Sequence, residues 1–219
     1  LLGHGSGSFG HVAGKIHGTR QGVKTPDQWL GFIEVWKAAR ELNQILVEIM
    51  HEEGLPVLAF PPSAMMNAQL GKVIEWNLDP IRQALDNGLI PIVYGDVVFD
   101  QQLGGTIIST EELFTHLAHK LGPQKIMLSG IVPGVFVDFP GCQDLIPKIT
   151  PVSRTSIQME LQGSASVDVT GGMLQKVDDM LSLTEQLNHL EAIIFSGETP
   201  ENLYNVIMDK KIGTLICQE

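Results

Sequence analysis

Short apolar runs alternate along this chain with longer segments in which apolar residues recur every three or four positions. The short runs are rich in β-branched residues, which is typical of strands buried on both faces. The alternation predicts an α/β fold, a three-layer αβα sandwich with a mainly parallel central sheet. The predicted strands are Pro56–Phe60, Leu89–Tyr94, Val97–Phe99, Thr106–Ser109, Lys125–Leu128, Val135–Val137, Glu191–Phe195 and Thr214–Cys217. The predicted helices are Pro26–Glu53, Asp79–Asn87, Thr110–Leu121, Gly172–Leu187 and Thr199–Met208.

Two helix boundaries carry local signals. Gly54 follows the first long helix, where a left-handed residue commonly ends a helix. Ser109 or Thr110 precedes Glu111 and Glu112, a pattern of an N-cap followed by acids in the first turn. The segment 95–105 is irregular enough for a hairpin, and 134–150 for a hairpin or flap.

The 219 residues fit one domain, and we expect residues 1–219 to form a single domain. The first residues, Leu1-Leu2-Gly3, resemble the end of a buried strand and include no initiator Met. We therefore expect residues that precede this sequence in the protein.

The charge balance is acidic, with 14 Lys and Arg against 25 Asp and Glu. A net charge of −11 argues against nucleic-acid binding, which depends on cation–phosphate attraction. No apolar run is long enough for a membrane span. The two cysteines are too few for a disulfide framework, so we expect reduced thiols in a cytoplasmic protein.

The most informative segment opens the chain, where a strand leads into glycines at positions 3, 5, 7 and 10. Glycine lets backbone N–H groups approach an anion, and a following helix would add the attraction of its N-terminus. Such a segment predicts a phosphate site, with a plain strand-to-helix turn as the alternative. His11, which ends the glycine loop, could donate an N–H to a bound phosphate during transfer or could simply pack in the core.

Other nucleotide motifs do not fit. The glycines at 5, 7 and 10 satisfy G-x-G-x-x-G, but that motif needs a second strand ending in an acid about 20 residues on. That region is an amphipathic helix here, and Asp27 is explained as part of its first turn. The P-loop and the nucleophile elbow are absent from the sequence.

A second glycine element lies at Asp168-Val169-Thr170-Gly171-Gly172, followed by a helix that carries Lys176. Lys176 lies one helical turn beyond Gly172, so it could reach phosphates held at the helix N-terminus. A plain turn with a solvated lysine is the alternative. We expect the two elements to face each other, one holding a phosphate acceptor and the other a donor, as phosphoryl transfer requires.

The whole pattern resembles the isopentenyl phosphate kinases, a branch of the amino acid kinase superfamily. The motifs that carry the resemblance match in order and spacing over nearly the whole chain. They are His4-Gly5-Ser6-Gly7-Ser8-Phe9-Gly10-His11, Phe60-Pro61-Pro62-Ser63-Ala64, Tyr94-Gly95-Asp96-Val97-Val98-Phe99-Asp100 and Asp168-Val169-Thr170-Gly171-Gly172-Met173 with Lys176.

The resemblance implies a homodimer that uses ATP and Mg²⁺ to convert isopentenyl phosphate into isopentenyl diphosphate. It assigns acceptor binding to Ser6, Gly7, His11 and Thr110, with His11 and Lys176 as catalytic residues. It assigns ATP binding to Gly7, Asp168, Gly171, Gly172 and Lys176, and it assigns no residue as a metal ligand.

Three departures from the family pattern are visible. The family's opening K-x-G-G-S strand would lie upstream of Leu1, and its lysine would contribute to the rate. Thr110 stands where the family has a substrate-contacting glycine. The segment 129–135 lacks the family's two aspartates.

Other readings stay open. The chain could be a related amino acid kinase acting on another phosphate, phosphonate or carboxylate, or a nucleotide-binding relative without catalysis. The Phe32–Trp36 helix face could wall an apolar acceptor tail or belong to the core. Glu112, His116 and His119 share a helix face and could bind a metal or be ordinary solvated residues.

Overall fold

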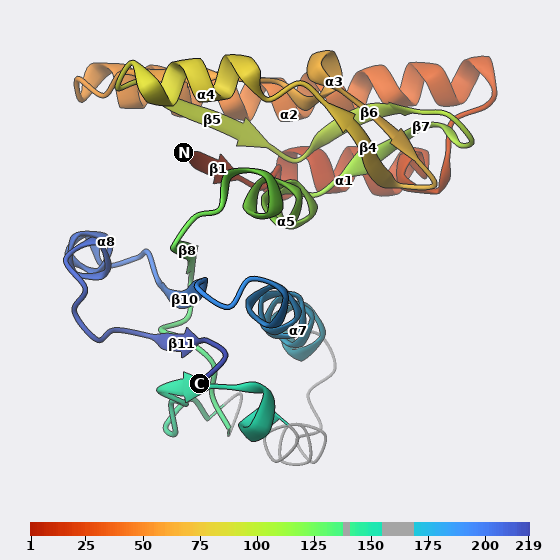
Figure 1. The fold of residues 1–219 in the computed structure, drawn as a ribbon. Helices are drawn as coiled ribbons and strands as arrows, with labels where there is room; N and C mark the ends of the chain where they lie inside the picture. The colour runs from red at the N-terminus through yellow and green to blue at the C-terminus, as the bar shows by residue number, and fades with distance from the viewer. Residues whose placement is uncertain (138–140, 155–168) are drawn as a thin grey trace. The chain divides into compact units, whose positions relative to one another are not determined.

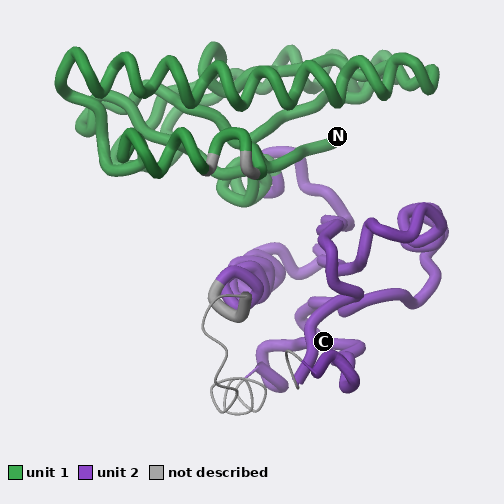
Figure 2. Tube along the Cα trace, turned by 180° about the vertical axis from the view of Figure 1, so that it is seen from behind, with its two compact units in different colours: residues 1–117 green, residues 118–219 purple. Residues whose placement is uncertain are grey.

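The computed structural model describes residues 1–137, 141–154 and 169–219, without the side chains of Ser8, His11 and residues 169–171. Its contacts divide the chain into two compact units, residues 1–117 and 118–219 (Figure 2). The single domain expected over residues 1–219 stays a prediction.

Unit 1 is built on a parallel sheet with strand order β1-β5-β2. Its strands are β1 (Leu2–His4), β5 (Ile90–Tyr94) and β2 (Val57–Ala59). The central strand β5 is buried from Pro91 onward, which explains its continuous apolar sequence. Because the three strands are parallel, their carboxyl ends lie at the same edge of the sheet.

Helices cover both faces of this sheet. The long helix α2 (Pro26–Glu52) packs against β2, and α4 (Asp79–Asp86) packs against β5. In Figure 1, α2 and α4 lie on one side of β5, and α5 (Thr110–Leu121) lies on the other. Neighbouring residues of β1 confirm this layering: a Cβ at Gly3 would meet α5, whereas the His4 ring contacts α2. Unit 1 therefore has the predicted order of layers, helix–sheet–helix.

A second sheet of unit 1 has the order β4-β3-β6-β7. Its strands are β3 (Met66–Gln69), β4 (Lys72–Trp76), β6 (Asp96–Asp100) and β7 (Gly104–Ile108). The strands β6 and β7 form the hairpin expected over residues 95–105. The Asp100 carboxylate accepts hydrogen bonds from Gln102 and Leu103 in that hairpin and from Leu70 and Gly71 in the β3–β4 turn. One side chain thus fixes both turns.

Unit 2 contains a sheet with order β8-β10-β11-β9. The strands are β8 (Lys125–Gly130), β10 (Glu191–Ser196), β11 (Thr214–Ile216) and β9 (Lys148–Ile149). Helix α7 (Val169–Gln186) packs against β10 and β11, and α8 (Pro200–Ile207) follows β10. Since β8 and β10 are parallel, their carboxyl ends at Gly130 and Ser196 lie at one edge.

Parallel pairing predominates, as predicted, although the strands form three hydrogen-bonded sheets. The antiparallel pairs are β3/β4, β6/β7 and β10/β11. The predicted helices are confirmed to within three residues at each end. Ser109 caps α5: its hydroxyl accepts from the Glu112 N–H, and the Glu112 carboxylate accepts from the Ser109 N–H. Gly54 is left-handed, with φ of 75°, and follows Glu53, the C-cap residue of α2.

Several elements differ from the prediction. Val135–Val137 is not a strand: Phe136 forms an isolated bridge with Leu145, and the Val135 N–H donates to the Thr214 hydroxyl. Strands β3, β4 and β9 and the short helices α3 (Pro62–Met65) and η1 (Thr19–Gln21) were not predicted. The β3–β4 turn holds Leu70 and Gly71 at positive φ. Its sequence lacks Asn-Gly, the pair that usually signals such a turn. No helix in the described residues is long and apolar enough to cross a membrane.

Candidate functional site

The first glycine element joins β1 to α1 (Gly7–His17) through only two residues, Gly5 and Ser6. The helix begins earlier than expected, so Gly10 and His11 belong to α1 and do not lie in a loop. Gly7 has φ of 50°, a left-handed conformation that glycine adopts without strain. The tight connection therefore brings the N-terminus of α1 directly to the carboxyl end of β1.

This N-terminus leaves room for an anion. A Cβ at Gly5 or Gly7 would meet no atom of the described residues within 4 Å, so these residues leave the backbone there open. The first N–H groups of a helix have no partner within the helix, and the Ser6 side chain makes no capping hydrogen bond. Open N–H groups at a helix N-terminus bind phosphate or carboxylate groups. The side chain of His11 lies outside the described part, so its role stays a prediction.

Thr110 supports this element from α5. Its hydroxyl donates to the His4 carbonyl oxygen at 2.6 Å and accepts from the Gly95 N–H at 2.9 Å. The hydroxyl therefore joins the carboxyl ends of β1 and β5 at the first residue of α5. The sequence predicts Thr110 as a substrate contact, and the structure adds this bridging role next to Gly5.

His4 holds β1 against α2. Its Nε2 lies 3.2 Å from Asn43 Oδ1, its Nδ1 lies 3.0 Å from the Gly5 carbonyl oxygen, and its ring stacks on Tyr94 with centroids 5.2 Å apart. These contacts fit a positioning role for His4, immediately before the open glycines. Asn43 was not predicted, although a polar residue in the apolar stripe of α2 is the signal that could have found it.

Asp96 follows Gly95 and is almost completely buried, with 1% of its surface exposed. Burial raises the pKa of its carboxyl to about 6, although hydrogen bonds from Ser63 and Val97 act in the opposite direction. The backbone N–H of Ser63 donates to Asp96 at 3.3 Å, and that of Val97 donates at 2.8 Å. Asp96 thereby links β6 to helix α3.

The second glycine element begins α7. The helix starts at Val169, so Gly171 and Gly172 lie in its first turn and not before it. A Cβ at Gly172 would meet no atom of the described residues within 4 Å, and Lys176 lies one turn further along the same helix, as predicted. Asp168 lies outside the described residues.

The edge formed by β8 and β10 in the same unit is also open at one glycine. A Cβ at Gly130 would meet no atom within 4 Å, and the Gly197 N–H donates to the Gly130 carbonyl oxygen at 2.8 Å. The Ser196 hydroxyl donates to the Ile131 carbonyl oxygen and accepts from the Glu198 N–H. These bonds fix the turns that follow both strands, even though 129–135 lacks acidic residues.

The two glycine elements lie in different compact units, the first in residues 1–117 and the second in 118–219. Their expected opposition across one site therefore stays a prediction. The first element has the features of a phosphate site, which are open backbone N–H groups at a helix N-terminus. At the second element, α7 supplies a helix N-terminus, and residues 155–168 before it lie outside the described part.

The weaker candidates have ordinary structural roles. Glu112 caps α5 and forms an ion pair with Arg20 at 2.8 Å, and the His116 ring packs on Trp76. No group of three or more metal-binding side chains occurs among the described residues. Phe32 belongs to a buried cluster with Val23, Val35 and Val97, against which Trp36 packs. The Phe32 end of the predicted tail wall is therefore core.

Comparisons with known proteins identify relatives along nearly the whole chain. The model of the amino acid kinase family matches residues 1–196. The chain is 28% identical to the isopentenyl phosphate kinase of Methanothermobacter thermautotrophicus, covering 99% of this chain and 83% of the relative. It is 30% identical to that of Methanocaldococcus jannaschii, covering 99% and 80%. A crystal structure of isopentenyl phosphate kinase superposes with a TM-score of 0.80 at 27% identity, covering 98% of this chain and 82% of the other.

Proposed function

The chain belongs to the amino acid kinase family, and on that premise we propose that it transfers a phosphoryl group from ATP to isopentenyl phosphate. The bond between the β–γ bridging oxygen and the γ-phosphorus of ATP breaks. A new bond forms between a phosphate oxygen of isopentenyl phosphate and that phosphorus, giving isopentenyl diphosphate and ADP. The observation that carries this proposal is the near full-length similarity to two isopentenyl phosphate kinases.

The acceptor phosphate is assigned to the β1–α1 element. Backbone N–H groups at Ser6 and Gly7 would hold its oxygens, with the α1 N-terminus favouring negative charge. His11 would donate an imidazole N–H to the same phosphate as charge shifts during transfer. Thr110 would contribute by keeping Gly5 in place and by contacting the acceptor. The open backbone at Gly5 and Gly7 supports this assignment.

The ATP phosphates are assigned to the α7 element and, across the site, to Gly7. Gly171 and Gly172 would let the phosphates approach the first turn of α7, and Lys176 would neutralise their charge. Asp168 would orient cations around the transferring group. Open space at Gly172 and Gly130 supports an ATP site at this edge of the unit 2 sheet.

We also propose that ATP is used as its Mg²⁺ complex. Mg²⁺ would neutralise charge on the β- and γ-phosphates during the transfer. The described residues form no cluster of three metal ligands. The phosphate oxygens of ATP would therefore supply most of the Mg²⁺ coordination. This fits the usual binding of Mg²⁺ through phosphate oxygens, water and few carboxylates.

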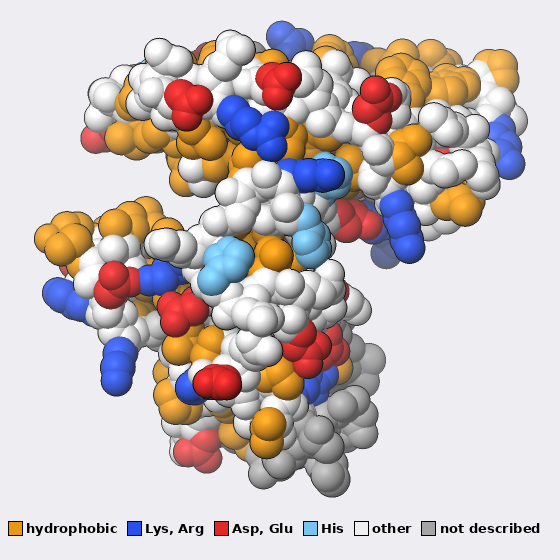
Figure 3. Space-filling view, viewed as in Figure 1, with side chains coloured by type: hydrophobic (Ala, Val, Ile, Leu, Met, Phe, Trp, Pro, Cys, Tyr) orange, Lys and Arg blue, Asp and Glu red, His pale blue; other side chains and the backbone are white. Residues whose placement is uncertain are grey.

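The proposed assembly is a cytoplasmic homodimer. Helix α2 exposes Leu30, Ile33, Ile45 and Ile49, and Figure 3 shows apolar side chains between charged ones on one face of unit 1. An apolar surface of this kind is typical of association between copies. Sedimentation of the full-length protein should give twice the monomer mass, and a monomer at micromolar concentration would contradict the proposal.

The test of the function is ATP consumption by the full-length protein with Mg²⁺, with and without isopentenyl phosphate. We expect strong stimulation by isopentenyl phosphate. ATP binding without stimulation would move the proposal to another phosphate, phosphonate or carboxylate acceptor, or to a relative without catalysis. Those two outcomes are separated by repeating the assay with N-acetylglutamate and with an alkyl phosphonate.

A further inference from the structure

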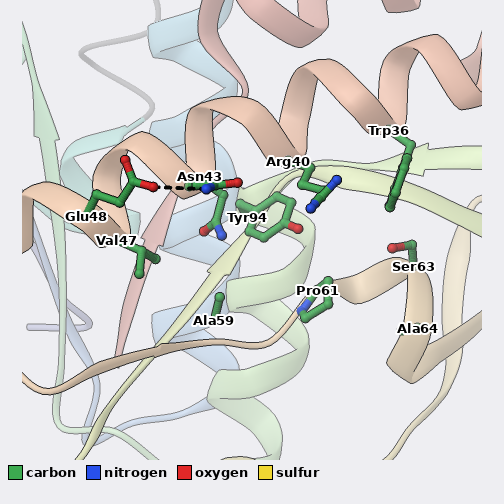
Figure 4. Close-up of a pocket in the computed structure, with 11 residues that line it drawn as sticks. Trp36, Arg40, Asn43, Val47, Glu48, Ala59, Pro61, Ser63, Ala64 and Tyr94 are labelled. Carbon is green, nitrogen blue, oxygen red and sulfur yellow. Dashed lines mark hydrogen bonds between the residues drawn. The ribbon is translucent and has the colours of Figure 1, made fainter. Parts of the chain in front are cut away.

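A pocket of about 490 Å³ opens in unit 1, on the α2 side of the parallel sheet (Figure 4). It lies between the C-terminal half of α2, the end of β2 and the loop that leads into α3. None of the residues assigned to the acceptor or to ATP lines it. The lining residues that matter here are Trp36, Arg40, Asn43, Ala59, Pro61 and Tyr94.

The floor of the pocket carries a polar group without a partner. Tyr94 is 2% exposed, yet its hydroxyl forms no hydrogen bond with the residues that the structure describes. Among the described residues, the fully buried side-chain polar atoms without a partner belong to Thr19, Trp76 and Arg154, so the Tyr94 hydroxyl is open to the pocket and available to a ligand there. Burial raises the pKa of Tyr94, with Asp96 adding to the rise and Arg40 opposing it, so the phenol keeps its proton. It is therefore a hydrogen-bond donor.

Arg40 supplies the charge. Its guanidinium lies over the Trp36 ring, 5.5 Å from the centroid, and no described residue forms an ion pair with it. Figure 4 shows the guanidinium on the same side of the pocket as the Tyr94 hydroxyl. A planar guanidinium beside a phenol donor matches the oxygens of a carboxylate or phosphate.

The remaining wall is mainly apolar. Trp36, Val47, Ala59 and Pro61 surround the space beside the two donors. The acidic residue at the far end, Glu48, already accepts a hydrogen bond from Gln44 at 2.9 Å. Pockets of this size with apolar walls and a few convergent polar groups bind small organic ligands.

We propose that this pocket binds an amphiphilic organic anion, with its phosphate or carboxylate on Arg40 and Tyr94 and its apolar body against Trp36, Ala59 and Pro61. The site is separate from the proposed acceptor site, so it does not depend on the proposed function. It adjoins His4, whose ring stacks on Tyr94 and whose Nε2 contacts Asn43 in the same pocket.

The test is calorimetric titration of the full-length protein with hexyl phosphate, without ATP or isopentenyl phosphate. Because hexyl phosphate is an alkyl phosphate like the proposed acceptor, we expect two saturable binding events, one at the acceptor site and one at this pocket. The Arg40→Gln variant should weaken the pocket event roughly tenfold, and Tyr94→Phe about threefold, as loss of charged and neutral hydrogen bonds respectively. Lys37→Gln, which removes an exposed charge paired with Glu34 on the same helix, is the matched control and should leave the affinity unchanged.

A second titration separates this pocket from the acceptor site. The pocket event should persist in His11→Ala, whereas the acceptor-site event should weaken there. Loss of both events in His11→Ala, or equal affinity of the pocket event in Arg40→Gln and Lys37→Gln, would overturn the proposal. Affinity that falls as the protein concentration rises would overturn it as well, because a second copy of the chain would then cover the pocket.

Discussion

The two glycine elements contain a matched pair of residues, because Gly10 and Gly172 are each the fourth residue of a helix. Their surroundings differ. A Cβ at Gly10 would collide with the Ser6 side chain, whereas a Cβ at Gly172 would meet no atom of the described residues within 4 Å. Gly10 is thus required by the fold of the β1–α1 connection, and Gly172 is not.

The difference extends to the neighbouring elements. The first element is fixed by α5 through Thr110 and by α2 through the contact between His4 and Asn43. The second depends mainly on one helix that packs on β10 and β11. In the proposed function, the first element would therefore be preorganised for one phosphate, and Gly172 of the second would let a ligand approach the first turn of α7.

The largest expected effects come from removing the assigned catalytic side chains. His11→Ala and Lys176→Ala should each lower kcat/KM by about 10²- to 10³-fold, as loss of a group that stabilises transition-state charge. His11→Ala should raise the KM for isopentenyl phosphate, and Lys176→Ala the KM for ATP. Steady-state kinetics with each substrate varied separates them.

His119→Ala and Lys210→Ala are the matched controls for those variants, since both side chains are exposed and lie in unit 2, His119 in the last turn of α5 and Lys210 in the loop after α8. They should keep normal activity. Retained activity in His11→Ala or Lys176→Ala would show that the site residues are assigned wrongly.

Alanine at the two matched glycines should change stability in opposite directions. Gly10→Ala should lower the free energy of unfolding by about 2 kcal/mol, because the Ser6 backbone must move. Gly172→Ala should raise it by up to about 1 kcal/mol through helix propensity and should weaken ATP binding. Urea denaturation measures the free energy of unfolding. Equal destabilisation by Gly10→Ala and Gly172→Ala would contradict the difference between the two glycines.

The stability of unit 1 should depend on pH through Asp96. Its folded pKa of about 6 lies above the ordinary value of 3.8, so the protonated form is favoured in the fold. The resulting stabilisation is complete below the ordinary value and is lost as the pH rises through about 6. Between pH 4 and 7, the free energy of unfolding of the wild type should fall by about 2 kcal/mol relative to that of Asp96→Asn.

That difference is measured by urea denaturation of both proteins at a series of pH values. The slope against pH is the informative quantity, because Asp96→Asn can shift the absolute stability by changing its hydrogen bonds. Parallel pH profiles for the two proteins would show that Asp96 does not titrate in this range.

The smallest expected effect tests the link from α5. Thr110→Val should lower the free energy of unfolding by about 1 kcal/mol. The effect is small because the Gly95 N–H also donates to the His4 carbonyl oxygen at 3.3 Å, and that hydrogen bond does not need the hydroxyl. Thr110→Ser keeps the hydroxyl and should behave like wild type. In Thr110→Val, the free energy of unfolding should fall and the KM for isopentenyl phosphate should rise. An unchanged KM would show that Thr110 does not act on the acceptor site.

Local sequence was sufficient where one segment determines its own structure. The Ser109–Glu112 capping pair and the left-handed Gly54 follow from residues adjacent in sequence. The buried strands of both units follow from their continuous apolar runs. The order of motifs along the chain was also sufficient to indicate the kinase family.

Features that depend on distant residues could not be predicted. The Leu70–Gly71 turn forms without a hairpin signal in its own sequence. The Asp100 carboxylate, 30 residues from Leu70, holds the turn by accepting hydrogen bonds from its N–H groups. Thr110 bridges β1 and β5 across 106 and 15 residues of sequence. The start of α1 at Gly7 was missed because four glycines in ten residues suggested a longer loop.

Phosphorus NMR of the full-length protein with ATP, Mg²⁺ and isopentenyl phosphate tests the central claim most directly. We predict that the isopentenyl phosphate resonance disappears while the two coupled resonances of an organic diphosphate grow together with those of ADP. An unchanged isopentenyl phosphate signal, whether ATP persists or is hydrolysed to inorganic phosphate, would contradict the proposed phosphoryl transfer.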